Sequence, residues 1–135
     1  MKNLKIFIWL LLGGIFLGSA QENDKISTLD FVQILDGNRE EVVFYYENNW
    51  KVLRKMAIER DYIHSYDVLE TPFSEEAPFE LILITTYKNN VQYELREEHF
   101  RKLISEKGEL KLLNNKKPNE FRRVLYNKEM VGHWE

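Results

Sequence analysis

The chain of 135 residues contains no cysteine. Disulfides and thiolate metal sites are therefore excluded, so the fold must be held together by its hydrophobic core alone. A cysteine nucleophile is excluded for the same reason, and no G-x-S-x-G motif supplies a serine nucleophile. A glycine-rich phosphate loop is also missing, because the sequence LLGG lies within an N-terminal apolar segment. The chain thus carries none of these common signatures of catalysis or nucleotide binding.

The chain also lacks a block of basic residues. Lys and Arg number 19 against 22 Asp and Glu, and the two signs are interleaved along the sequence. Nucleic acids and anionic membrane surfaces are bound through a basic surface. The sequence therefore predicts neither of them as a partner.

Long hydrophobic runs are missing too, apart from one short segment at the N-terminus. Two lysines precede the apolar run Ile6–Leu17, and the small residues GSA follow it. This order is typical of a secretory signal peptide, residues 1–20, that is cleaved after Ala20. The alternative is an uncleaved membrane anchor, but the run is shorter than the roughly 20 residues that a spanning helix needs.

Cleavage predicts an exported protein, periplasmic or extracellular, with no stable membrane insertion. A lipoprotein needs a cysteine at its new N-terminus, so we expect a soluble protein and not a lipoprotein. The remaining chain is long enough for one domain without covalent staples. We expect a flexible leader (residues 21–28), a domain (29–126) and a C-terminal tail (127–135).

The first half of the domain has a β-α-β pattern. A strand, Leu29–Leu35, is rich in β-formers and ends at the turn sequence DGN. An amphipathic helix follows over Arg39–Arg60, with Asn38 as N-cap and Glu41 at the capping-box position. A second strand is predicted over Tyr62–Glu70.

The first helix has an apolar stripe with spacings of three and four residues, formed by Val43, Tyr46, Trp50, Leu53 and Ala57. This period predicts that the stripe is buried. The charged residues fall on the other face, which we expect to be solvated: Glu47, Lys51, Arg54 and Lys55.

The second half repeats the pattern. The strand Glu80–Tyr87 is followed by a helix that starts at Asn89 or Asn90 and ends at Lys107, before Gly108. A last strand is predicted over Glu120–Tyr126. The order β-α-β-β-α-β predicts an α+β, ferredoxin-like sandwich, in which a four-stranded antiparallel sheet carries both helices on one face.

The strand Glu80–Tyr87 is apolar in both of its alternating sets, Leu81 and Leu83 on one side and Ile82 and Ile84 on the other. A strand of this kind is covered on both faces. Two helices cover only one face, and the simplest cover for the other is the sheet of a second copy. The sequence therefore predicts a homodimer.

Three segments carry a family resemblance: LDGNREEVVFYYENNW, IHSYDVL and FELILITTYKNNVQYELREEHFRKL. Through them the chain resembles the dimeric α+β-barrel superfamily, and most of all its NIPSNAP and EthD-type members, over Leu29–Leu125, about seven-tenths of its length. The resemblance implies a homodimer whose two sheets close into a barrel, with a cavity between sheet and helices in each subunit. The superfamily includes cofactor-free monooxygenases and haem-degrading and haem-dependent enzymes. The sequence ERDYIHSY departs from the NIPSNAP pattern, in which a glycine is usual near Asp61.

The three histidines are His64, His99 and His133, and their spacing matches no known metal motif. We predict no metal and no cofactor. His64 and His99 are the candidates for a catalytic base, because histidine titrates near neutral pH without a shift.

Aromatic and polar side chains of the first helix and second strand form a candidate ligand pocket: Tyr46, Trp50, Tyr62, His64 and Tyr66. Rings with polar tips suit a flat, partly apolar molecule. The alternative is core packing, which is favoured because helical spacing alone accounts for Tyr46 and Trp50.

Three functions remain open from the sequence. The first is an exported homodimer that binds a small apolar or aromatic molecule without catalysis. The second is a cofactor-independent enzyme of the monooxygenase or isomerase kind, using His64 or His99. The third is a protein that docks a partner through its tail sequence MVGHWE.

Overall fold

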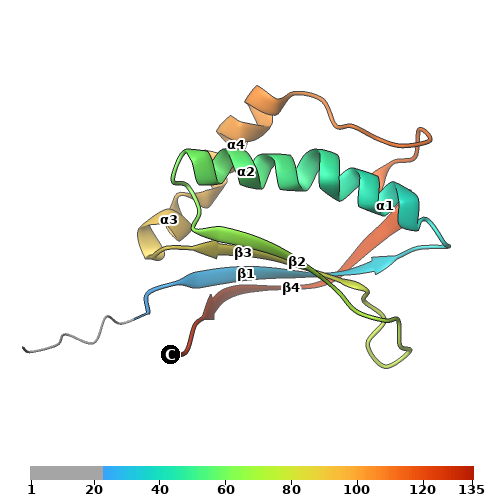
Figure 1. Ribbon diagram of the computed structural model, residues 1–135, viewed down its shortest axis with the longest axis horizontal. Helices are drawn as coiled ribbons and strands as arrows, with labels where there is room; N and C mark the ends of the chain where they lie inside the picture. The colour runs from blue at the N-terminus through green and yellow to red at the C-terminus, as the bar shows by residue number, and fades with distance from the viewer. Residues whose placement is uncertain (1–22) are drawn as a thin grey trace, which may run out of the picture.

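The computed structural model describes residues 23–135 (Figure 1). The predicted signal peptide, residues 1–20, lies outside the described residues. Within the described part, no helix is long and apolar enough to cross a membrane.

One layer of the molecule is a four-stranded antiparallel sheet with the strand order β2-β3-β1-β4. Strands β1 and β3 pair with each other at its centre, β2 pairs with β3, and β4 pairs with β1. The bounds of the strands are β1 Ile26–Ile34, β2 Ser65–Glu70, β3 Leu81–Tyr87 and β4 Arg122–Gly132. The α+β class and the antiparallel four-stranded sheet predicted from the sequence are therefore confirmed.

The helices all lie on one side of this sheet, as Figure 1 shows. A continuous helical rod crosses the sheet, and a second helical segment follows β3 and packs beside the rod. The opposite side of the sheet carries no helix in the described part of the chain, but the loop 71–80 and the C-terminal end after β4 extend there, where His133 Nε2 and Ser27 Oγ lie 2.7 Å apart in a hydrogen bond. The bounds are α1 Arg39–Tyr45, η1 Tyr46–Trp50, α2 Lys51–Glu59, α3 Asn90–Glu94, α4 Arg96–Lys107 and the single turn α5 Pro118–Phe121.

The last strand is longer than predicted. It continues past Tyr126 to Gly132, so most of the predicted tail pairs with β1, from Asn127 opposite Asp30 to Gly132 opposite Ile26. The pattern hides this strand because it lies at an edge of the sheet, where backbone pairing holds it and few apolar side chains are needed.

The capping prediction is correct for one helix and wrong for the other. Asn89 caps α3 by accepting a hydrogen bond from the backbone N–H of Gln92 at 3.0 Å. Asn38 holds the N-cap position of α1 but makes no such bond, because its side-chain oxygen accepts from the ammonium of Lys116 while its amide donates to the carbonyl of Leu35 at 2.7 Å. Its predicted partner Glu41 is buried and accepts from Lys116 at 2.9 Å. Contacts with a distant segment thus replace the local cap.

The helix-facing side of the sheet is buried in two apolar clusters. One lies under α1 and η1 and contains Val32, Val42, Tyr46, Leu81, Leu83 and Phe121. The other lies under α2 and α4 and contains Ala57, Ile63, Tyr87, Tyr93 and Leu103. Burial of these side chains is the main source of stability, because no covalent cross-link is present.

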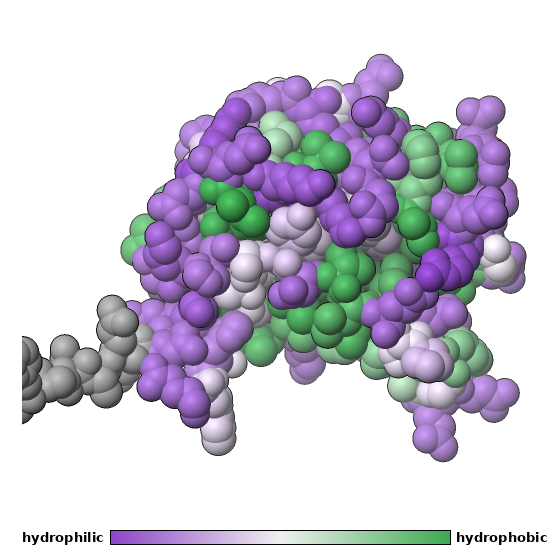
Figure 2. Space-filling model, in the orientation of Figure 1, coloured by the Kyte–Doolittle hydropathy of each residue, from purple (hydrophilic) through white to green (hydrophobic). Residues whose placement is uncertain are grey.

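The other side of the sheet, which we call the free face, is apolar at its centre and at one end, whereas Ser27 and Thr86 at the other end are buried and hydrogen-bonded to each other. Residues opposite each other in antiparallel strands share one face, so the partners of Ile82 and Ile84 lie on the free face with them. In the order β2-β3-β1-β4 they form three rows: Ser65-Thr86-Ser27-Val131, Asp67-Ile84-Leu29-Lys128 and Leu69-Ile82-Phe31-Tyr126. Figure 2 shows apolar side chains gathered at the lower margin of the molecule, below the sheet.

Substitution of Phe121 tests how much the first apolar cluster contributes to the stability of the fold. Its side chain is 0% exposed, so Phe121→Ala should lower the free energy of unfolding by about 3–5 kcal/mol through lost burial and a residual cavity. Phe73, in the loop 71–80, is 53% exposed, and Phe73→Ala should change stability by less than about 0.5 kcal/mol. Urea unfolding followed by circular dichroism measures both, and equal losses would contradict this assignment of the core.

Candidate functional site

The candidate site begins with the π-helical segment η1 in the middle of the first helical rod. A π turn accommodates one more residue than an α turn, so it shifts the side chains that follow by one position. The inward positions are Val42 before η1, Tyr46 and Asn49 within it, and Arg54 and Ala57 after it. Leu53 also packs against the second apolar cluster, so Arg54 turns inward beside it.

This shift overturns part of the predicted stripe. Arg54 was expected on the solvated face, but it is largely buried and forms contacts inside the protein. Val43 was expected to be buried, but it is 41% exposed. The predicted stripe is therefore wrong at Val43 and Arg54, whereas Ala57 is buried and Leu53 packs against the second apolar cluster as predicted.

A pocket of about 350 Å³ lies between this rod and α4. We call it the η1–α4 pocket. Aromatic side chains come from η1 and its neighbours, and aliphatic side chains come from α2, α4 and the loop after it. The lining residues are Tyr45, Asn49, Trp50, Leu53, Arg54, Ile104, Lys107, Gly108 and Leu110. This volume is within the range of small-molecule sites.

Arg54 is held in this pocket by two rings and one hydrogen bond. Its guanidinium carbon lies 4.2 Å from the centroid of Trp50 and 4.5 Å from that of Phe100. Its Nε donates to Thr85 Oγ1 on β3 at 3.2 Å. Trp50 is fixed in turn by an edge-to-face contact with Tyr66, at 5.7 Å between centroids. The guanidinium is thus held by two cation–π contacts and one hydrogen bond.

Burial lowers the pKa of Arg54 to about 10, against the opposing influence of nearby Tyr87 and Asp30. The side chain therefore remains protonated at neutral pH. Burial also raises the pKa of Asp30, which β1 presents on the helix side of the sheet, while Arg54 and Arg122 act in the opposite direction. The interior below the helices therefore contains two guanidinium groups and one carboxyl group in a partly desolvated setting.

Arg122 approaches the same region from β4. Its Nη2 donates to the hydroxyl of Tyr45 at 3.5 Å, and its guanidinium carbon lies 5.1 Å from the ring of Tyr45. Its Nε is buried and has no hydrogen-bond partner among the described residues. Both arginines thus lie close to aromatic rings.

Asn49 fastens the loop after α4 to η1. Its amide group donates to the carbonyls of Tyr45 and Lys111, at 2.9 and 2.8 Å. Its oxygen accepts from the ammonium of Lys107 and from the backbone N–H of Lys111, both at 2.8 Å. The side chain is buried and uses its full set of donors and acceptors, so it fixes one wall of the pocket.

The predicted pocket residues do not form a single group. Trp50 and Tyr66 lie together beside Arg54. Tyr46 is buried in the first apolar cluster, and this burial raises the pKa of its hydroxyl. Tyr62 stacks on a ring of α4, and His64 is exposed just before β2.

The histidine candidates lie apart from the η1–α4 pocket. The ring of His99 stacks on Tyr62, with 3.7 Å between centroids and 8° between planes. Its Nδ1 is buried without a hydrogen-bond partner in the described part of the chain. Neither His64 nor His99 lines the pocket. Residues 23–135 also contain no cluster of three or more metal-ligating side chains of His, Asp or Glu.

Sequence reasoning did not single out Asn49, Phe100 or Lys107, and it misplaced Arg54. The adjacent asparagines Asn48 and Asn49 are one available signal, because asparagine is unfavourable within a regular helix. They mark the position of η1, which forms the pocket wall.

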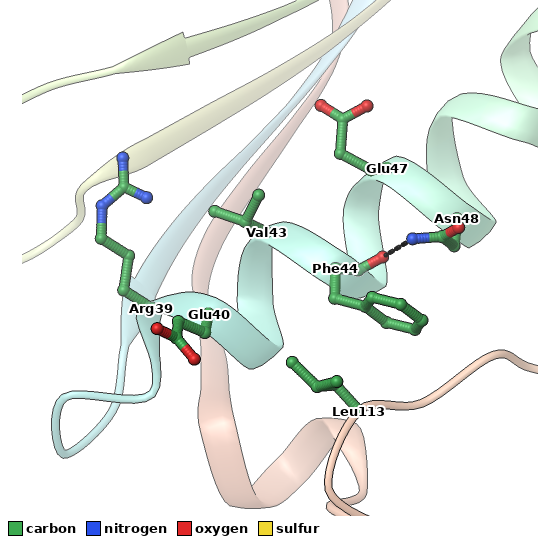
Figure 3. Close-up of a pocket in the computed structure, with 7 residues that line it drawn as sticks. All are labelled: Arg39, Glu40, Val43, Phe44, Glu47, Asn48 and Leu113. Atoms are coloured by element: carbon green, nitrogen blue, oxygen red, sulfur yellow. Dashed lines mark hydrogen bonds between the residues drawn. The ribbon is translucent and has the colours of Figure 1, made fainter.

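A second hollow of about 520 Å³ lies on the outer side of α1. Figure 3 shows the ring of Phe44 pointing towards Leu113, and the amide of Asn48 donating to the carbonyl of Phe44. Its rim carries Arg39 together with Glu40 and Glu47. A third hollow of about 260 Å³, lined by Tyr46, contains the ion pair of Arg39 and Glu70. Charges of both signs thus line each of these two hollows.

Comparison with known proteins adds no family to this picture. No protein-family model matches the chain, and no curated protein matches it either.

Asn49→Ala should destabilise the protein by about 2 kcal/mol, because it leaves partly buried backbone groups of Lys111 without their hydrogen-bond partner. Hydrogen exchange over residues 108–113 should accelerate at the same time, since the loop loses its attachment. Asn48→Ala is the matched control, because it removes a single bond to the carbonyl of Phe44 and should cost about 1 kcal/mol. Unchanged exchange in Asn49→Ala would contradict the role given to this side chain.

Proposed function

We propose that the chain is a ferredoxin-like domain that forms a homodimer through its free face and binds a small, flat, largely apolar molecule in the η1–α4 pocket of each subunit. The observation that carries the ligand proposal is the pocket itself, with aromatic and aliphatic walls and a fixed polar group, Arg54. The fold proposal is supported by the order of elements and by the central position of β1 and β3 in the sheet. The likeness to NIPSNAP and EthD-type barrels stays part of this proposal.

The rows of the free face are complementary to themselves. A two-fold axis parallel to the strands sets β2 of one copy over β4 of the other. Asp67 then faces Lys128 of the partner subunit, and Ile84 faces Leu29 of the partner subunit, because all four positions belong to one row. In the next row Leu69 meets Tyr126 of the partner subunit. In the rows of Ile84 and Ile82, apolar side chains thus meet apolar side chains, and acid meets base at the rim.

The size of the face fits a dimer. Four strands and three residue rows span roughly 20 Å by 20 Å, and side-chain relief increases the accessible area. Stable complexes bury about 800 Å² per partner. The loop 71–80 projects on the same side and adds Phe79, whose ring lies 5.0 Å from that of Phe31. Sheets packed in this way cross at about 30°, so the row matching holds best at the centre.

Ile84→Lys should weaken the dimer at least about a hundredfold, because each subunit then buries an ammonium group at the apolar centre of the interface. Asp67→Lys should weaken it about tenfold through two like-charge contacts at the rim, and adding Lys128→Asp should restore it. Sedimentation velocity over a concentration series measures these constants.

Ile58→Lys is the control for this series. Ile58 lies on α2 and is 42% exposed, so the substitution adds the same charge to the helix layer and should leave association unchanged. Equal association of Ile84→Lys and wild type would contradict the proposed interface, as would a charge-swapped pair that stays weak.

We also propose that the protein is exported from the cytoplasm before it carries out this function. Export is supported by the order of basic, apolar and small residues within 1–20. The enzyme alternative has less support. The exposed His64 and the stacked His99 both lie outside the pocket lining, so neither is placed to act on a molecule bound there.

Ligand binding can be tested with N-phenyl-1-naphthylamine, a neutral aromatic probe that fluoresces in apolar sites. We expect micromolar binding to the wild type, and about tenfold weaker binding to Ile104→Trp, which places an indole in the pocket mouth. Ile104 is 54% exposed, so this change should leave the fold intact. Ile84→Lys is the control and should bind the probe as the wild type does. An unaltered affinity in Ile104→Trp would contradict the pocket.

A further inference from the structure

The charge of the η1–α4 pocket is of one sign. Its lining includes the cations Arg54 and Lys107 and no carboxylate. The two other hollows described above each contain both signs. The chain as a whole has a net charge of −3, so a purely cationic lining runs against its overall balance.

The guanidinium of Arg54 is fixed by its contacts but forms no ion pair with a carboxylate of the described residues. Within the described residues its hydrogen bond runs from Nε to Thr85, and it takes part in none of the ion pairs. Asp30 influences Arg54 without forming an ion pair with it. A buried cation of this kind is costly unless an anion or hydrogen-bond acceptors approach it.

The packing of Arg54 decides which part of it is available. Its guanidinium lies against the rings of Trp50 and Phe100, and Nε is bound to Thr85, so the Nη groups are left for a ligand. A fixed guanidinium edge matches the two oxygens of a carboxylate or a sulfonate. Lys107 is tied to Asn49 at 2.8 Å and adds positive potential without being free to move.

We propose that the molecule bound in this pocket is an organic anion with a flat apolar body, and that the Nη edge of Arg54 binds its carboxylate or a similar acidic group. The body lies against Trp50, Leu53 and Ile104. This inference rests on the proposed function, because it specifies the ligand of the same pocket. Arg54 is then the residue that selects acids over neutral compounds of the same shape.

Two probes that differ only by an acidic group test the inference. These are 8-anilinonaphthalene-1-sulfonate and N-phenyl-1-naphthylamine, which lacks the sulfonate. The wild type should bind the sulfonate at least about tenfold more tightly than the neutral probe, since a charge-assisted hydrogen bond to a fixed guanidinium is gained. Fluorescence titration of the full domain measures both affinities.

Arg54→Gln should remove this preference, weakening the sulfonate at least about tenfold while leaving the neutral probe within about twofold. Arg54→Lys should give an intermediate preference, because it keeps the charge and loses the planar edge. Lys55→Gln is the control, since Lys55 is the next residue, exposed on the same helix, and should leave both affinities unchanged. Thermal unfolding of each variant shows whether the fold is retained.

The outcomes separate this inference from the function on which it rests. One outcome overturns the inference but supports the pocket. In it, the neutral probe binds the wild type and binds Ile104→Trp more weakly, but the wild type binds the sulfonate no more tightly than the neutral probe. A sulfonate preference that persists in Arg54→Gln overturns the role of Arg54. If neither probe binds, the pocket and the inference both fail. The wild-type comparison decides the matter even if Arg54→Gln does not fold.

Discussion

The side chains of β3 point alternately to the two faces of the sheet, and both sets are apolar. One protomer covers only the face that carries Leu81 and Leu83, with the helical rod and the segment beside it. Ile82 and Ile84 lie on the face without helices. The hydrophobic effect acts on this face as it does on the core, and the chain has no disulfide to compensate for leaving it wet. The proposed dimer follows from this constraint.

Covering the second face in a dimer leaves the helix layer free to hold a site. There the guanidinium of Arg54 turns inward just after the π turn η1. Placing Arg54 beside Asp30 and two aromatic rings costs free energy that an apolar side chain would not cost. The side chain of Asn49 in the same turn forms hydrogen bonds with all of its donors and acceptors. The costly burial of Arg54 lies at the proposed pocket, and locally unfavourable features of this kind are often found at functional sites.

The sequence predicts the layers of this fold well, because periodic apolar residues report burial directly. The two-sided pattern of β3 and the cap at Asn89 are visible without a structure. The long edge strand β4 and the missing cap at Asn38 could not be predicted, since both depend on partners distant in sequence, β1 and Lys116. The site was predicted only in outline. Trp50 lines the pocket and contacts Tyr66, whereas Arg54 was misplaced because the wider π turn of η1 alters which side chains after it face the sheet.

The most direct test of the covered face is solvent access to isoleucine methyl groups, measured by NMR with a soluble paramagnetic agent at a concentration well above that needed for association. Ile82 and Ile84 report the free face, Ile63 in the core is the shielded reference, and Ile58 and Ile104 on the helices are the accessible references. The account predicts that Ile82 and Ile84 are shielded like Ile63 and become accessible on dilution. Relaxation of Ile82 and Ile84 as strong as that of Ile58 at every concentration would contradict it.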